Sequence, residues 1–172
     1  YKRQPADSAS DIAIGDFNGD GRFEIALCQP GNLNSFTTST SIFCLQAREA
    51  TLWQKLESHD ARRIFGVRES NGDADQLIVL NLMARSKRGD IDVAIYYGGS
   101  DGFNSQRCLR LPGFGATVAV CADLTDNGWP DVIVTNTSEN AVDEDPGSYI
   151  FFNGPEGLSA RLDSSRRAIR TE

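Results

Sequence analysis

Two short segments of the chain place oxygen-bearing side chains at alternate positions of a glycine-containing turn. Residues 16–24 follow the pattern Asp-x-(Asp/Asn)-x-(Asp/Asn)-Gly-x-x-(Asp/Glu), and residues 123–131 follow it with Thr at the third position. Ca²⁺ takes six to eight hard oxygen ligands, and a tight turn with this spacing can wrap one ion. In residues 16–24, called the first loop, the predicted ligands are Asp16, Asn18, Asp20, the carbonyl of Arg22 and Glu24. In residues 123–131, called the third loop because a weaker one lies between them, they are Asp123, Thr125, Asn127, the carbonyl of Trp129 and Asp131.

The two loops differ in the charge that they offer a cation. Gly21 and Gly128 supply the turn glycine of each loop, whose free backbone permits the conformation that the turn needs. The first loop contributes three carboxylates, whereas the third contributes two, and Thr125 is a weaker ligand than Asp or Asn. We therefore expect the third loop to bind calcium less tightly.

A middle acidic loop departs from the pattern. Ala74 replaces the turn glycine, and Leu77 stands where the last acid belongs, although a one-residue shift of the alignment places Gln76 there. We expect this loop to bind weakly or not at all. The simpler alternative for all three loops is an ordinary turn, because Asp and Asn side chains bond to nearby backbone N–H groups. The candidate ligands of the middle loop are Glu69, Asn71 and Asp73.

The acidic loops belong to a longer internal repeat. Their leading acids are spaced 53 and 54 residues apart (16 to 69, then 69 to 123). A second motif, an aromatic segment followed by a glycine-rich turn, begins at residue 94 and again at residue 149, a spacing of 55 residues. Two features that share one period indicate a repeated structural unit. The three similar stretches around the acidic loops are residues 12–29, 64–81 and 118–136.

Each unit alternates short apolar runs with Gly, Asn and Asp turns, which is typical of strands. This pattern predicts an all-β fold with four short antiparallel strands per unit. Helical periodicity is weak, with one possible short helix around residues 48–57. The predicted units span about residues 10–60, 61–115 and 116–172.

At these motifs the chain resembles the FG-GAP/VCBS repeat family, which includes the integrin α-subunit propellers. The resemblance is carried by DFNGDGRFEIAL, ADLTDNGWPDVIV, IYYGGSDGF and FFNGPEGL and covers nearly the whole chain in about three copies. It implies a β-propeller with structural calcium, extracellular or on a cell surface (periplasmic in a bacterium), that binds proteins or glycans. Family propellers usually have about seven blades, so three units imply an arc completed by further blades or by other copies of the chain.

Composition limits the possible functions. The chain has 172 residues and a formal net charge of −7, which argues against nucleic acid or an anionic membrane as the main partner. No apolar run is long enough to insert into a membrane, and Tyr1 in place of Met leads us to expect a longer precursor. His59 is the only histidine, and no nucleophile, base and orienting group recur together, so no enzymatic activity is expected.

The four cysteines form no Cys-x-x-Cys pair, which argues against a zinc knuckle or a thioredoxin-like motif. Cys121 lies in an apolar run and is expected to be a buried thiol. Cys28 and Cys44 could face each other across a hairpin and form a disulfide, whereas Arg88-Gly89-Asp90 and the Asn136-Thr137-Ser138 sequon are weak motifs.

The leading functional hypothesis is a calcium-binding segment that acts in adhesion or ligand binding through its variable loops. Such loops, at residues 30–41, 82–90 and 137–148, would present the contact surface of a propeller. Two alternatives remain open: a non-catalytic accessory module of a larger secreted protein, and a glycan-binding lectin. Trp129, which precedes Pro130 in a loop, is the best candidate for an exposed aromatic side chain that stacks on a sugar.

Overall fold

The computed structural model describes residues 8–32, 34–68, 74–84, 89–137 and 147–158, which form strands and one short 3₁₀ turn (η1, Ser105–Arg107) and no α-helix. The expected all-β class is thus confirmed. The strands are β1 (Asp11–Gly15), β2 (Glu24–Cys28), β3 (Thr37–Gln46), β4 (Glu49–His59), β5 (Arg63–Val67), β6 (Gln76–Leu80), β7 (Val93–Tyr97), β8 (Cys108–Leu111), β9 (Val118–Ala122), β10 (Asp131–Thr135) and β11 (Tyr149–Phe151).

The strands form three separate antiparallel sheets in chain order. The first sheet has the order β1-β2-β3-β4, the second β5-β6-β7-β8, and the third, within the described residues, β11-β10-β9. Consecutive strands pair with each other throughout, so every connection inside a sheet is a hairpin. The strands of the three sheets fall within residues 10–60, 61–115 and 116–172, respectively.

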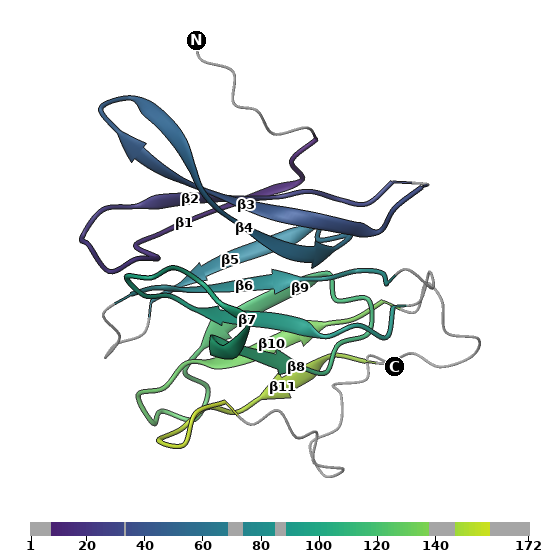
Figure 1. The fold of residues 1–172 in the computed structure, drawn as a ribbon. Coiled ribbons are helices and arrows are strands. Elements are labelled where there is room, and N and C mark those ends of the chain that lie inside the picture. The colour runs from purple at the N-terminus through teal and green to yellow at the C-terminus, as the bar shows by residue number, and fades with distance from the viewer. Residues whose placement is uncertain (1–7, 33, 69–73, 85–88, 138–146, 159–172) are drawn as a thin grey trace.

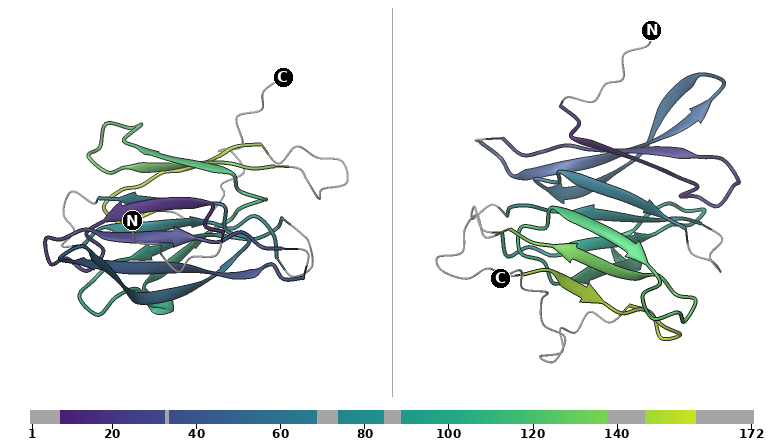
Figure 2. Two further views of the ribbon diagram at one scale, coloured as in Figure 1. Left: turned by 90° about the horizontal axis from the view of Figure 1, so that it is seen from above. Right: turned by 180° about the vertical axis from the view of Figure 1, so that it is seen from behind.

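The sheets stack face to face. Figure 1 shows β1–β4 in the upper part of the molecule and the other two sheets below, and the view from behind in Figure 2 brings β9–β11 to the front. All five residues of β6 are buried, because the second sheet is covered on both faces. Strands buried on both faces read as continuous apolar runs, which explains the sequence Leu-Ile-Val-Leu at residues 77–80.

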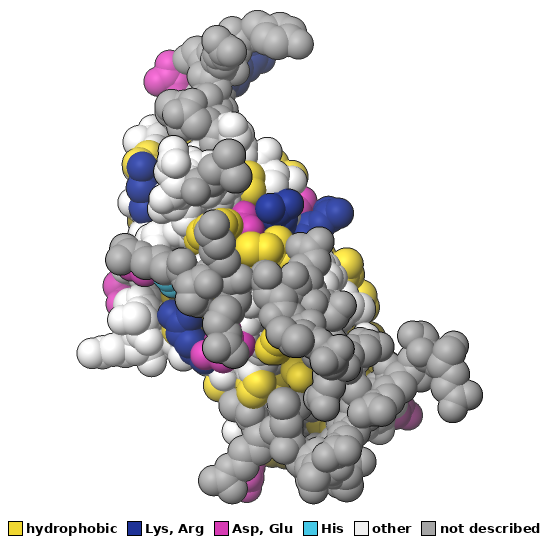
Figure 3. Space-filling model, turned by 90° about the vertical axis from the view of Figure 1, so that its right-hand side faces the viewer, with side chains coloured by type: hydrophobic (Ala, Val, Ile, Leu, Met, Phe, Trp, Pro, Cys, Tyr) yellow, Lys and Arg dark blue, Asp and Glu magenta, His cyan; other side chains and the backbone are white. Residues whose placement is uncertain are grey.

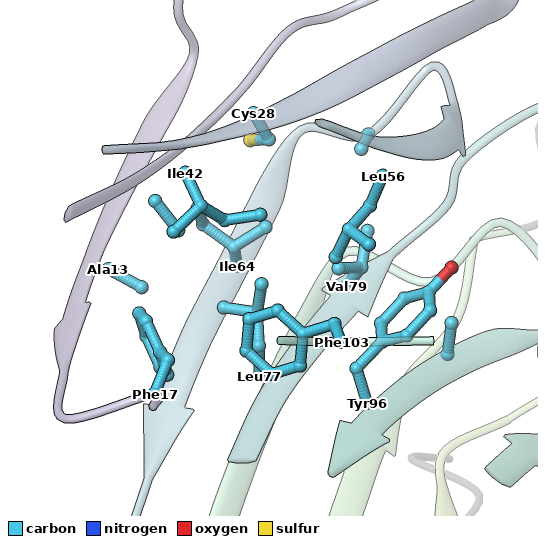
Figure 4. Packing of buried hydrophobic residues seen from close by; sticks show 13 residues of the cluster. Ala13, Phe17, Cys28, Ile42, Leu56, Ile64, Leu77, Val79, Tyr96 and Phe103 are labelled. Atoms are coloured by element: carbon cyan, nitrogen blue, oxygen red, sulfur yellow. The ribbon is translucent and has the colours of Figure 1, made fainter. Parts of the chain in front are cut away.

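Two hydrophobic cores separate the three layers. Alternate side chains of a strand point to opposite faces, so Leu77 and Val79 pack toward the first sheet, whereas Ile78 and Leu80 pack toward the third. Figure 4 shows the first core, where side chains of β1–β4 meet those of β5–β7. Phe103, which follows the turn after β7, packs there against the aromatic ring of Phe17 with a centroid distance of 5.4 Å.

The predicted helix at residues 48–57 is wrong. All of them except Arg48 lie in β4, which pairs with β3 from Thr37↔His59 to Gln46↔Glu49 with one register shift between Ile42 and Phe43. The β3–β4 hairpin projects from the upper left of Figure 1, and its turn places Ala47 and Arg48 at φ values of 53° and 98°. Pairing with a strand rich in Thr, Ser, Ile and Phe outweighs the local helix preference of Ala, Arg and Glu.

The suggested Cys28–Cys44 disulfide is also wrong, because the register separates the two residues. Cys44 lies opposite Glu24 at one end of β2, whereas Cys28 lies at the other end. All four cysteines are free thiols. Cys121 is half-buried on the third sheet, and burial raises the pKa of its thiol to about 11.

Candidate metal-binding loops

The first acidic loop joins β1 to β2 and is held in shape by its own side chains. Asp16 Oδ1 accepts hydrogen bonds from the backbone N–H groups of Gly19 (2.9 Å) and Asp20 (3.0 Å), and its Oδ2 accepts one from Gly21 (2.9 Å). Asn18 Oδ1 accepts from Asp20 N, and Asp20 Oδ1 accepts from Arg22 N, both at 2.8 Å. The predicted side-chain ligands therefore turn into the loop.

Glu24 closes the first loop from the start of β2. Its side chain is buried, Oε2 accepts a hydrogen bond from Phe17 N at 2.9 Å, and Oε1 accepts one from Asn18 Nδ2 at 3.2 Å. Burial raises the pKa of Glu24, the two N–H donors oppose that rise, and the charges of Asp20 and Asp16 add to it. The three carboxylates thus lie close enough to repel one another, which is the electrostatic situation that a cation relieves.

The third acidic loop, between β9 and β10, repeats this hydrogen-bond pattern with different residues. Asp123 Oδ1 accepts from Asn127 N at 3.0 Å and its Oδ2 from Gly128 N at 2.7 Å, while Asn127 Oδ1 accepts from Trp129 N at 2.8 Å. The hydrogen bond from Gly128 N is the main cause of a lowered pKa of Asp123. Both loops use left-handed backbone at the fourth and sixth positions, Gly19 and Gly21 in one and Asp126 and Gly128 in the other.

Asp131 occupies the position of Glu24 in the third loop, and both of its carboxylate oxygens accept hydrogen bonds from backbone N–H groups. It is fully buried, its Oδ2 accepts a hydrogen bond from Leu124 N at 2.9 Å, and its Oδ1 accepts one from Asn153 N at 2.7 Å. Asn127 Nδ2 in turn donates to Asn153 O at 2.9 Å. The last acid of the third loop therefore anchors the turn after β11, and Thr125 is exposed.

The first loop contains more carboxylates than the third: Asp16, Asp20 and Glu24 against Asp123 and Asp131. Within the described parts of the chain, no three Asp, Glu, His or Cys side chains form a group that could hold a metal ion as they stand. In the first loop, Asp16 Oδ2, Asp20 Oδ1 and both oxygens of Glu24 each accept one hydrogen bond and retain a lone pair, whereas Asp16 Oδ1 already accepts two. None of the described Lys or Arg side chains forms an ion pair with Asp16, Asp20 or Glu24. Arg22 is exposed and Trp129 is half-buried, and their carbonyls are the predicted backbone ligands.

The candidate ligands of the middle loop, Glu69, Asn71 and Asp73, lie outside the described residues. The flanking strands fix the alignment: Val67 pairs with Gln76 just as Gly15 pairs with Glu24 and Ala122 with Asp131. Gln76, not Leu77, therefore occupies the position of the last acid, as the shifted alignment proposed. With this register, Arg68 follows β5 at the place where Asp16 and Asp123 follow their strands.

Asp75 is a structural acid that the sequence analysis missed. It is buried, its Oδ2 accepts a hydrogen bond from Asp16 N at 2.8 Å, and its own N–H donates to Asp16 O at 2.8 Å. Arg68 Nε lies 3.2 Å from its other carboxylate oxygen, Oδ1. The first acidic loop is thus docked onto the second sheet. An acid just before an apolar strand is the only sequence signal, and it does not distinguish this role from an exposed turn.

Two asparagines that follow the second strand of their sheets were also missed. Asn81 Oδ1 accepts a hydrogen bond from His59 N at 2.8 Å, and Asn136 Oδ1 accepts one from Phe114 N at 2.9 Å. Leu82 N and Thr137 N return hydrogen bonds to His59 O and Phe114 O. Each pair of hydrogen bonds connects the end of a sheet's second strand to the segment that precedes its first strand. Asn81 and Asn136 are 55 residues apart. An Asn that ends each apolar run is the signal that could have revealed them.

A polar groove lies on the first variable loop. Its volume is about 550 Å³, and the turn beside it is fixed by Asp60, whose Oδ1 accepts a hydrogen bond from Gly31 N at 2.6 Å. Hydroxyl and amide side chains dominate its wall, and none of the described residues that line it is charged. The lining residues are Ser8, Gln29, Pro30, Gly31, Asn32, Thr37, Thr38 and Ser39.

The surface shown in Figure 3 mixes the described basic and acidic side chains with hydrophobic ones rather than presenting an uninterrupted basic area. A helix long and apolar enough to span a membrane is not found among the described residues. Comparisons with protein-family models and with curated proteins find no match to this chain.

Proposed function

We propose that the chain is a calcium-binding segment of a β-propeller of the FG-GAP/VCBS type, extracellular or on a cell surface, that binds protein or glycan ligands and has no catalytic role. The observation that carries this proposal is the common hydrogen-bond pattern of the first and third acidic loops. Two loops of different sequence place a leading Asp, a turn Gly and a closing acid in equivalent roles between paired strands. Calcium loops require this combination of turn and ligands.

Calcium would act structurally in this proposal. Asp16, Asn18, Asp20 and Glu24, with the carbonyl of Arg22, would hold the ion in the first loop. The third loop would hold one less tightly, because it offers two carboxylates where the first offers three. The ion supplies positive charge that offsets repulsion among the loop carboxylates. Because the folded loop binds the ion and the unfolded chain does not, calcium binding adds to the free energy of unfolding.

A glycan is the ligand class that the groove on the first variable loop favours. Sugars present hydroxyl groups, and the described residues of the groove wall offer hydroxyl and amide partners without charge. This supports the lectin-like alternative, either in the chain alone or in an accessory module of a larger secreted protein. A glycan array read with wild type and with Thr38→Val, which removes one hydroxyl of the wall, would show this activity.

Thermal unfolding with and without calcium tests the main proposal. We expect about 2 mM calcium to raise the midpoint of the wild type by about 5–10 °C over EDTA, the shift for a site that is nearly saturated. Asp20→Asn removes a carboxylate yet retains the oxygen that accepts the Arg22 hydrogen bond, so the variant should fold but lose most of the shift.

Asp101→Asn is the matched control, because Asp101 is an exposed acid on a glycine-rich turn outside the acidic loops. It should keep the full calcium response. An equal calcium response in Asp20→Asn and wild type, or none in the wild type, would refute structural calcium in the first loop and leave it an ordinary Asx turn.

A further inference from the structure

The exposed hydrophobic side chains gather on the outward faces of the two end sheets. Among the described residues, eight large hydrophobic side chains are between 43% and 59% exposed. Five lie on or beside the first sheet and three on or beside the third, and none lies on the second. They are Ile12, Ile14, Phe23, Leu45 and Leu52 on the first sheet, and Val118, Val120 and Leu124 on the third.

Strand alternation places these residues on the outer sides of the stack. Ile12 and Ile14 flank Ala13, which points into the first core, so they point away from the second sheet. Val118 and Val120 flank Ala119, which points into the second core, so they too point outward. Within the described residues, each end of the stack is therefore an apolar sheet face without a covering layer, which marks an interaction surface.

The two outward faces differ in which positions of the leading strand they present, and the contacts between neighbouring sheets show why this matters. At the first junction the third residue of β1, Ala13, faces the second residue of β5, Ile64. At the second junction the third residue of β5, Phe65, faces the second residue of β9, Ala119. The stack thus runs in one direction, with third-position side chains always facing second-position side chains.

The free face of the first sheet carries the second position of its leading strand, Ile12, and the free face of the third sheet carries the third position, Val120. The outer face of the third sheet therefore matches the face that the first and second sheets each turn toward the next sheet. The outer face of the first sheet matches the face that receives this contact. We propose that the outer face of the third sheet of one copy packs on the outer face of the first sheet of a second copy, in a head-to-tail assembly. Such a contact is heterologous, so it generates rings or open chains rather than closed two-fold dimers.

The acidic loops provide a second reason for this arrangement. Phe17, one residue after the leading Asp of the first loop, is fully buried between the first and second sheets. Leu124 follows the leading Asp of the third loop in the same way but is 49% exposed, because none of the described residues forms a layer beyond the third sheet. In the proposed assembly Leu124 fills the corresponding place beside Leu45 and Leu52 of the next copy.

Sedimentation velocity of the 172-residue chain from about 1 μM to about 0.5 mM, spanning dissociation constants of ordinary weak complexes, tests the proposal. We expect a concentration-dependent rise in mass, greater at high salt because each copy carries a net charge of −7. Ile14→Asp and Val120→Asp should each weaken association at least about tenfold while leaving the dilute protein folded by circular dichroism, since both side chains are exposed in the single copy. Ser105→Asp, an exposed site on the second sheet's 3₁₀ turn, is the charge-matched control and should associate like the wild type.

Mixing the two variants separates this geometry from others. Ile14→Asp retains an intact third-sheet face and Val120→Asp an intact first-sheet face, so the mixture should form heterodimers and stop there. A contact between two first-sheet faces would instead survive Val120→Asp unchanged, which would overturn the head-to-tail order. A wild type that remains monomeric at every concentration and salt level would overturn self-association itself. The calcium proposal does not depend on either result.

Discussion

The carboxylate of Glu24 is a proposed calcium ligand that also accepts hydrogen bonds within the folded protein. It is buried at the first acidic loop, where it accepts hydrogen bonds from Phe17 N and Asn18 Nδ2. Burial raises its pKa, so folding favours the protonated form. The stabilisation from this group is complete below its ordinary value of 4.5 and is lost as the pH rises through the higher folded value.

Glu24→Gln is therefore predicted to have a small effect on stability at pH 7 without calcium and a larger one with it. At pH 7 without metal, the free energy of unfolding of the variant should lie within about 1 kcal/mol of the wild-type value, since the amide oxygen can still accept a hydrogen bond. As the pH falls toward 4.5, the wild type should gain stability relative to the variant. With calcium at pH 7 the wild type should be the more stable protein, because the variant has lost a ligand charge.

Urea unfolding at several pH values, in EDTA and in calcium, measures these differences. Glu57→Gln is a suitable control, because the Glu57 side chain is 72% exposed on β4 and lies away from the loop. A calcium response of Glu24→Gln as large as that of the wild type would show that Glu24 serves the fold alone.

At the residue scale, the spacing of the acids predicted the leading and closing acids of the loops but not which hydrogen bonds each of them forms. Asp16, Asp123 and Glu24 do turn into their loops as the alternation suggests. Asp131 matches Glu24 in the sequence pattern, yet its second oxygen is used by Asn153, a residue 22 positions later in the chain. Such a long-range hydrogen bond leaves no local signature, and the same is true of Asp75.

At the element scale, the first and third loops differ in how the residue after the leading Asp is used. Phe17 lies between two sheets with its ring 5.4 Å from that of Phe103, and a Cβ at Gly15 would meet the Phe17 ring at 2.6 Å. The absence of a side chain at Gly15 thus gives the ring its place. No described residue forms such a layer over Leu124 in the single copy.

This difference predicts unequal costs for the same truncation at equivalent positions. Phe17→Ala should lower the free energy of unfolding by about 3–5 kcal/mol, the usual cost of emptying a buried aromatic site. Leu124→Ala should change it by less than about 0.5 kcal/mol, as expected for an exposed side chain. Urea unfolding at low protein concentration, where copies are separate, measures both values. A small effect of Phe17→Ala would mean that the first loop is not docked on the second sheet.

The β3–β4 hairpin shows why element type was harder to predict than element order. Residues 48–57 contain Ala, Arg, Glu, Gln, Lys and Leu, which favour helices when considered alone. Their partner strand β3 lies immediately before them, and ten of the eleven residues of β4 pair with it. Local composition cannot report such pairing, whereas the alternating apolar runs of β1, β2 and β6 carried their strand character in the sequence itself.

At the scale of the whole molecule, the sequence predicted the all-β class and the order of strands better than the arrangement of the layers. The continuous apolar run at residues 77–80 is buried on both faces because the second sheet lies between two others. The isoleucines and valines of β1 and β9 look equally apolar in the sequence but are half exposed. Only the stacking order distinguishes a middle sheet from an end sheet.

This layering predicts a gradient of local stability through the stack. Amide groups of β6 should exchange with solvent most slowly, near the rate set by global unfolding, because β6 pairs with strands on both sides and is buried on both faces. Amides of β1 and β9, the edge strands of the end sheets, should exchange faster. Hydrogen exchange followed by mass spectrometry or NMR at low protein concentration would measure this order.

Repeating the measurement at high concentration connects the gradient to the proposed assembly. Covering the end sheets should slow exchange in β1 and β9 while leaving β6 unchanged, since β6 is already enclosed within one copy. Ile14→Asp should abolish that concentration dependence in both strands, because a head-to-tail contact requires both faces. If β6 exchanged as fast as β9 in the dilute protein, the three sheets would open independently, and the stack would not behave as one cooperative unit.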